Sequence, residues 1–234
     1  MAFTSFANRL PDPVFKITEA GENSNSGLAG PGFASVKFSS EQPISVSRTN
    51  SGRMITRAIV SHRWKINITY NPMTRDEFEP VYNFLLEKRG RLKPFFVKLP
   101  QHSPRTSTSS TYTVQGAHTA GSSSLLVTVG SSGANLRPGD LINISDSQDS
   151  THKKAYQITR VNDSTNKLST DSELNLSTER RLFVTPPLSK AVSDTSTLTY
   201  DNPLIRVLLT SDVQEYDLGT NNLYQFSLNL EEAQ

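Results

Sequence analysis

The sequence predicts a mainly β protein with one principal helix and a small all-β barrel inserted into the first domain. Three observations lead to this fold class. Residues 64–70 and 223–230 alternate apolar and polar side chains with the period of a half-buried strand. Residues 74–89 carry an apolar stripe at helical spacing. Residues 111–188 hold short β-prone runs separated by turn sequences, a pattern typical of a small barrel or sandwich.

The strand expected at residues 64–70 contains Trp64, the only tryptophan of the chain. The run after residue 223 has the same alternation, and we expect it to pair with the Trp64 strand. Residues 50–52, Asn-Ser-Gly, form a hairpin-type turn sequence before that strand. The predicted core takes residues from both strands, the helix and the strand that follows it: Trp64, Ile66, Phe78, Leu85, Phe95 and Phe226.

Signals at both ends predict the helix over residues 74–89. Thr74 and Glu77 fit a capping box, in which each satisfies a free amide of the first turn. Gly90 suits the position that follows a helix. Pro80 lies past the first turn, where proline costs about 3 kcal/mol, so we expect a kink there or a helix that begins at Pro80. The apolar stripe comprises Phe78, Val81, Tyr82, Leu85 and Leu86.

Composition divides the chain into two domains. Residues 101–110 are rich in serine and threonine and are typical of a linker. The β-prone runs that follow define an inserted barrel domain over residues 111–188, with its last strand at residues 181–185. The remainder returns to the first domain, which therefore comprises residues 1–110 with 189–234.

Composition also narrows the classes of function. The chain has no cysteine, which excludes disulfides, thiolate metal sites and a cysteine nucleophile. Its net charge of +2 is too small to indicate a nucleic-acid partner. No apolar run is long enough to span a membrane, and the first ten residues lack the hydrophobic region of a signal peptide. We expect a protein that is soluble and intracellular when made.

Basic residues concentrate in one segment. Residues 53–105 hold 11 Lys and Arg against four acids, so this segment carries +7 and the rest of the chain −5. One interpretation is a solvated face together with charges at the helix C-terminus. The other is electrostatic complementarity between copies of the chain or with a partner. The second interpretation takes these interface residues: Arg63, Lys65, Arg89, Arg91 and Lys93.

No motif predicts an active site. The four histidines are dispersed, without the spacing of a zinc site. Asp140, Asp146 and Asp149 lack the spacing of a calcium loop and are interpreted as surface turn residues. Asp171 and Glu173 are the only candidate carboxylate pair for glycoside cleavage, and no spacing rule supports them. We therefore predict no enzyme, no catalytic residue, no metal and no cofactor.

The order of the motifs resembles a recurring segment of long-tailed bacteriophage tail proteins. The first domain matches at residues 63–66 (RWKI), 72–78 (PMTRDEF), 84–86 (FLL) with 89–91 (RGR), and 94–97 (PFFV). This succession of aromatic strand, tight turn, helix, R-G-R and aromatic strand is similar to that of distal tail, baseplate-hub and minor tail proteins. The inserted domain resembles the small β-barrel of such proteins at residues 136–142 (LRPGDLI) and 186–188 (PPL).

This resemblance implies a tail-tube-like β-barrel or sandwich domain with one helix, carrying an OB-like barrel. It implies a structural protein of the virion, made in the host cytoplasm, that joins the tail tube to the baseplate hub or tip. The implied partners are copies of the chain in a hexameric ring, tail-tube proteins and baseplate-hub proteins. DNA would pass through the channel without specific nucleic-acid binding, and no membrane is involved.

Two alternatives remain open. The first is a receptor- or carbohydrate-binding module of a phage tail, with residues 111–188 as the recognition domain and Tyr112 and Tyr156 as candidate contacts. The second is a hydrolase of cell-wall polysaccharide, which would use Asp171 and Glu173.

Overall fold

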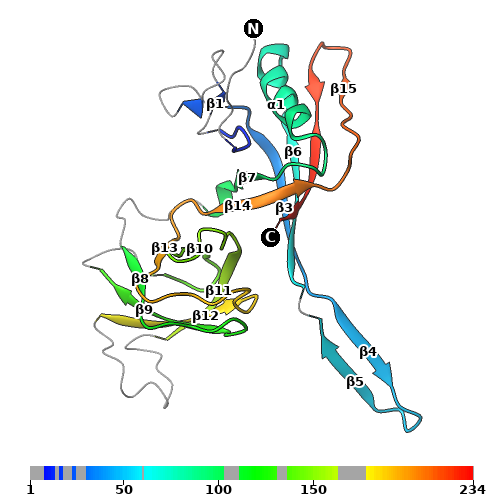
Figure 1. Ribbon diagram of the computed structural model, residues 1–234. Helices are drawn as coiled ribbons and strands as arrows, with labels where there is room; N and C mark the ends of the chain where they lie inside the picture. The colour runs from blue at the N-terminus through cyan, green and yellow to red at the C-terminus, as the bar shows by residue number, and fades with distance from the viewer. Residues whose placement is uncertain are drawn as a thin grey trace. The chain divides into compact units, whose positions relative to one another are not determined.

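The computed structural model describes residues 8–13, 16–17, 23–24, 30–59, 61–102, 111–130, 136–162 and 178–233. Two compact units make up the chain: Met1–Val97 with Arg206–Ala233, and Lys98–Ile205 with Gln234. The second unit is therefore longer at both ends than the expected insertion of residues 111–188. Both units consist mainly of strands, and the predicted mainly β class with one principal helix is confirmed (Figure 1).

A five-stranded sheet is the main element of the first unit, in the order β3-β6-β17-β14-β7. Its strands are β3 (Phe33–Glu41), β6 (Arg63–Tyr70), β7 (Phe95–Lys98), β14 (Leu204–Leu209) and β17 (Ser227–Glu232). The predicted pairing of the two alternating strands is confirmed, because Leu228 of β17 lies opposite Ile68 of β6 and Leu230 lies opposite Ile66.

The alternation of the sequence determines which face of β6 is buried. Trp64, Ile66 and Ile68 are buried, whereas the residues between them are exposed. Trp64 stacks on Phe38 at 4.5 Å between ring centroids and meets the edge of the His62 ring at 4.5 Å. All six residues chosen for the core are at most 4% exposed: Trp64, Ile66, Phe78, Leu85, Phe95 and Phe226.

The helix α1 (Arg75–Lys88) begins with the predicted capping box, in which the Thr74 amide donates to Glu77 Oε2 at 3.0 Å. Pro80 lies inside the helix. The expected alternative start at Pro80 is therefore wrong, because the capping box already satisfies the first turn upstream of the proline. The helix ends in two left-handed residues, Arg89 (φ 54°) and Gly90 (φ 62°).

The buried face of α1 differs from the predicted stripe at two positions, Tyr82, which is half-buried, and Leu86. Phe78, Val81 and Leu85 are buried as expected, but Leu86 is 48% exposed. Phe84 is fully buried in its place and meets the ring of Phe95 edge-on at 5.4 Å. The prediction for Leu86 fails because the sheet contacts the side of the helix that holds Phe84, which periodicity alone does not determine.

The second unit is a closed barrel in the order β10-β11-β12-β9-β8-β13, which confirms the predicted small all-β barrel. Its strands are β8 (Tyr112–Val114), β9 (Ser124–Val129), β10 (Leu141–Ser145), β11 (Ala155–Asn162), β12 (Glu179–Thr185) and β13 (Thr197–Thr199). The expectation that residues 181–185 form the last strand is wrong. The strand β13 follows them and pairs with both β8 and β10, which closes the barrel.

The remaining elements are short: β1 (Lys16–Ile17), β2 (Asn23–Ser24), β4 (Ile44–Arg48), β5 (Met54–Ala58), the 3-10 helix η1 (Pro100–His102), β15 (Asp217–Leu218) and β16 (Tyr224–Gln225). Within the described residues, no helix has the length and apolar character needed to cross a membrane.

Candidate assembly surface

The β4–β5 hairpin exposes a row of large apolar side chains. Cross-strand register places Val46 opposite Thr56 and Arg48 opposite Met54, so Ile44, Val46 and Met54 share one face. These three side chains are 56%, 55% and 56% exposed. Figure 1 shows no other strand beside the hairpin. A two-stranded hairpin is only marginally stable alone in water, so this face is a candidate contact surface.

Local hydrogen bonds close the tip of the hairpin, in line with the predicted turn at residues 50–52. The Thr49 amide donates to the Arg53 carbonyl at 3.0 Å, and the Arg53 amide donates to Thr49 Oγ1 at 3.1 Å. Gly52 has φ +81°, a conformation that glycine adopts without a Cβ penalty. The turn chemistry therefore favours the register in which Arg48 lies opposite Met54.

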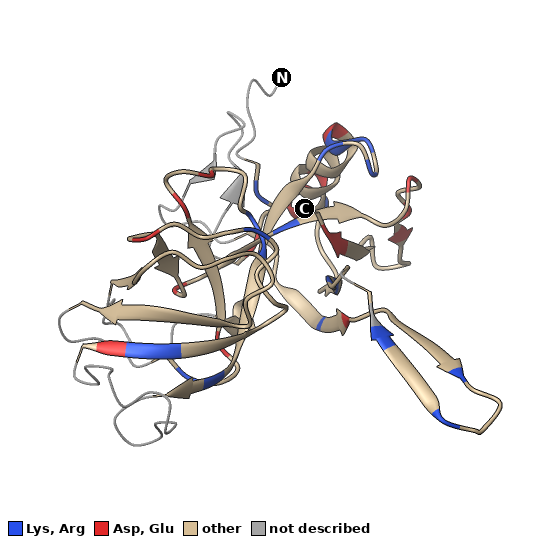
Figure 2. Ribbon diagram, turned by 60° about the horizontal axis from the view of Figure 1, so that its bottom comes forward, with Lys and Arg blue, Asp and Glu red and all other residues tan. Residues whose placement is uncertain are grey.

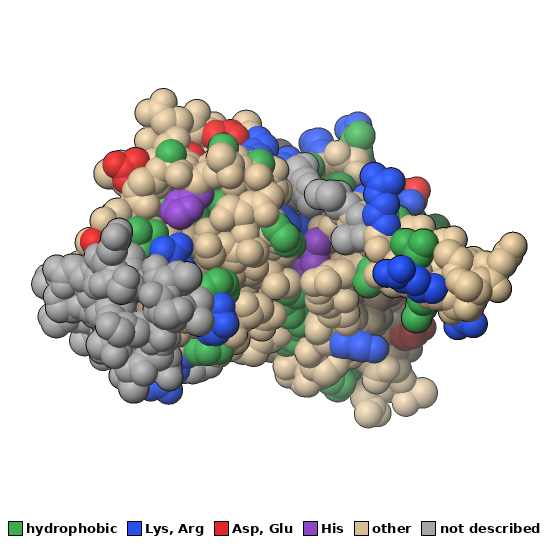
Figure 3. Space-filling view, turned by 90° about the horizontal axis from the view of Figure 1, so that it is seen from below, with side chains coloured by type: hydrophobic (Ala, Val, Ile, Leu, Met, Phe, Trp, Pro, Cys, Tyr) green, Lys and Arg blue, Asp and Glu red, His purple; other side chains and the backbone are tan. Residues whose placement is uncertain are grey.

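The β4–β5 hairpin is also basic. Arg48, Arg53 and Arg57 are the only charged residues between positions 43 and 59, and all three are exposed. In the described part of the chain they form no ion pair. In Figure 2 every charged position on the hairpin is basic. Figure 3 shows basic and hydrophobic side chains next to each other on the hairpin, at the right of the view.

Residues 211–218, which we call the acidic segment, form a second exposed surface in the same unit. Glu215 and Asp217 are exposed there, and Val213 and Leu218 are 62% and 54% exposed. The intervening Tyr216 packs its ring against Phe78 at 4.9 Å and against Tyr82 at 5.3 Å. These ring contacts anchor the segment beside α1, while the carboxylates of Glu215 and Asp217 stay at the surface.

A groove of about 230 Å³ adjoins the acidic segment. One wall is formed by Leu209, Ser211 and residues 213–215, and the other by Phe226 and the first three residues of β17. Leu209, Val213 and Leu228 contribute apolar lining. Ser211, Gln214, Glu215 and Asn229 also line the groove, so its lining is mainly polar and includes an anionic group.

The five basic residues predicted for an interface fall into two groups. Arg63 and Lys65 lie on the exposed side of β6, where Arg63 pairs with Glu231 and Lys65 pairs with Glu41 at 2.9 Å. The other group is exposed in the turn after α1 and comprises Arg89, Arg91 and Lys93.

Contacts within the chain engage part of this second group. Arg91 donates to the Thr210 carbonyl, and its amide donates to Asp212 Oδ1 at 3.3 Å. The interface role of the five residues stays a prediction. The hairpin and the acidic segment were not predicted as surfaces, although the absence of acids between positions 43 and 59 was a readable signal.

The aspartates of the barrel stabilise turns. Asp146 accepts the amides of Gln148 and Ser193, both at 2.8 Å, and these hydrogen bonds lower the pKa of its carboxyl. Asp146 is 7% exposed, so its expected surface position is wrong: the carboxylate turns inward to reach those amides. Asp149 accepts the amide of Thr151 at 2.8 Å. Among the described residues, no group of His, Asp and Glu is arranged to hold a metal.

The two tyrosines proposed as carbohydrate contacts are not available for stacking. Tyr112 is 1% exposed and Tyr156 is fully buried, so that assignment is wrong. The Tyr156 hydroxyl hydrogen-bonds His152 Nε2 at 2.8 Å and Ser189 Oγ at 3.0 Å inside the barrel. Their inward direction follows from the closed barrel, which needs large apolar side chains to fill its interior. The candidate pair Asp171 and Glu173 lies outside the described residues.

Comparison with known proteins finds a relative that matches over nearly the whole chain. The sequence is similar to "Distal tail protein pb9" of Escherichia phage T5, with 28% identity over 228 residues, 96% of this chain and 99% of the relative. No protein-family model matches the chain. Because the alignment covers nearly the whole length of both proteins, it includes the sheet unit as well as the inserted barrel.

Proposed function

We propose that this chain, which belongs with the phage distal tail proteins, is a structural component of a phage tail that assembles into a hexameric ring. In this role it joins the tail tube to the baseplate hub or tip. The homology over nearly the full chain is the observation that carries the proposal. The surface features of the first unit support the assembly step independently.

The edge strand β3 supports association between copies. Among the described residues, β3 pairs only with β6, so its outer edge is open over Phe33–Glu41. The opposite edge is covered, because the Leu10 amide donates to the Phe96 carbonyl at 2.8 Å. A long open edge promotes association in an isolated protein. Heterologous contacts that close into a ring occupy such edges.

The proposed role is non-enzymatic and takes no cofactor. The partners are further copies of the chain, tail-tube subunits and baseplate-hub proteins, and the location is the virion. DNA would pass through the ring without sequence-specific contacts. The barrel, whose closed sheet offers no strand edge, would contact neighbouring tail proteins through its loops and side chains.

Native mass spectrometry of the purified protein, alone and mixed with tail-tube subunits of the same phage, tests this function. The expected result is a ring of six subunits that also binds the end of assembled tubes, with electron microscopy locating it at the tube tip. A particle that stays monomeric at all concentrations and never joins a tube would refute the proposal.

A further inference from the structure

We propose that the β4–β5 hairpin of one copy docks on the acidic segment, residues 211–218, of a second copy. The apolar face of the hairpin packs against Val213 and Leu218 beside the groove, and Arg48 and Arg53 face Glu215 and Asp217. This inference rests on the proposed function, because it names the contact that holds copies together within the assembly.

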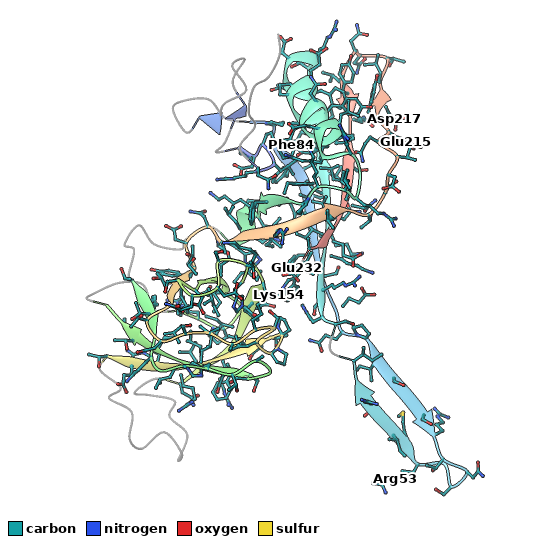
Figure 4. All side chains as sticks on the ribbon, viewed as in Figure 1. Arg53, Phe84, Lys154, Glu215, Asp217 and Glu232 are labelled. Carbon is teal, nitrogen blue, oxygen red and sulfur yellow. The ribbon has the colours of Figure 1, made fainter. Side chains whose placement is uncertain are left out.

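Charge is the first argument. Arg48 and Arg53 of the hairpin, and Glu215 and Asp217 of the acidic segment, are all exposed. Figure 4 shows Arg53 at the tip of the hairpin and the two acids at the far end of the same unit, beside α1. The two sets therefore do not neutralise each other within one chain. Complementary patches on one surface steer two copies together and select the register in which they meet.

Apolar surface is the second argument. Ile44, Val46 and Met54 line one face of the hairpin, and Val213 and Leu218 are exposed on the acidic segment. Each surface places basic or acidic groups next to large apolar side chains. Apolar atoms removed from water provide affinity, whereas the flanking charges provide orientation. The groove of about 230 Å³ offers an indentation for side chains of the hairpin.

Symmetry is the third argument. The hairpin and the acidic segment are different surfaces, so a contact between them is heterologous. Every copy then donates one hairpin and accepts another, and the contact repeats until the rotation closes into a ring. An isologous dimer would instead use one patch on both subunits.

Charge reversal tests the contact. One variant carries Arg48→Glu and Arg53→Glu, and a second carries Glu215→Lys and Asp217→Lys. Each alone places like charges at the contact, so we expect at least a tenfold weaker assembly by native mass spectrometry and sedimentation velocity at 50 mM NaCl. An equimolar mixture should recover assembly with the two variants alternating, because each hairpin then meets an opposite charge. The chain with all four changes should recover it as well.

A matched control changes the same amount of charge elsewhere. Arg137→Glu with Lys153→Glu alters two exposed residues of the barrel, and this variant should assemble like the unchanged protein. Trp64 fluorescence and far-UV circular dichroism verify that each variant is folded. If the hairpin and segment variants assemble normally while the unchanged protein forms rings, this contact is wrong and the proposed function stands. If the unchanged protein never assembles, both are wrong.

Cross-linking gives a second, independent readout, since the chain has no cysteine of its own. A mixture of Val46→Cys and Val213→Cys should form disulfide-linked heterodimers under mild oxidation. Either variant alone should form far fewer linked dimers. Equal yields from the mixture and from the single variants would contradict a hairpin-to-segment contact.

Discussion

Replacing Trp64 with alanine tests whether the β6–β17 layer is the core of the first unit. Trp64 is 2% exposed and stacks on Phe38 at 4.5 Å. A buried tryptophan removes about 150–250 Å² from water, which corresponds to roughly 4–6 kcal/mol at 25 cal/mol per Å² as an upper bound. The stacked pair adds about 0.5–1.5 kcal/mol. Partial relaxation around the cavity brings the expected loss of unfolding free energy to about 3–5 kcal/mol.

The assay must report on the first unit without tryptophan fluorescence, which the variant lacks. Hydrogen exchange measured by mass spectrometry across a urea series follows peptides from β6 and β17, and peptides from β11 in the barrel serve as an internal control. Leu86→Ala is the matched control, because Leu86 is 48% exposed and its loss should cost less than about 1 kcal/mol. A loss below about 1 kcal/mol for Trp64→Ala would refute the assignment of this strand to the core.

Three further changes test local features. Thr74→Ala removes one half of the capping box and should lower the stability of α1 by about 1 kcal/mol, seen as faster amide exchange in its first turn. Gly90→Ala places a Cβ 2.8 Å from Asp212 Oδ1 at φ +62°, so thermal unfolding of the first unit should reveal a loss of about 1–3 kcal/mol; an unchanged midpoint would contradict the close approach. Burial lowers the pKa of His152. The pKa of this histidine in the unfolded chain is about 6.5, so near and below that pH the unfolded chain binds more protons than the folded chain. The stability of the barrel should therefore decrease as the pH is lowered through this range. His152→Gln should flatten this dependence in urea titrations between pH 7.5 and 5, and an equal slope in both proteins would refute the assignment.

Local sequence determined the elements whose causes are local. The strict alternation around Trp64 sets a period of two, which leaves one face of β6 apolar in any pairing that buries it. The capping box at Thr74 and Glu77 determines where α1 begins, even though Pro80 follows. The turn at Gly52 determines the hairpin. Each of these depends on residues within a few positions of one another, so the pattern and its physical consequence occupy the same short stretch.

Only the tertiary structure decided which of these surfaces are covered. The strand β13 (Thr197–Thr199) has too few residues to show a period, and its pairing with β8 and β10 depends on distant strands. The helix presents Phe84 rather than Leu86 to the sheet because sheet position, not helical spacing, selects the buried side. The hairpin row that includes Ile44 has the alternation of a buried strand, yet it is exposed because none of the other described strands lies beside it. Burial depends on what else the chain brings near, and that is a property of the whole fold.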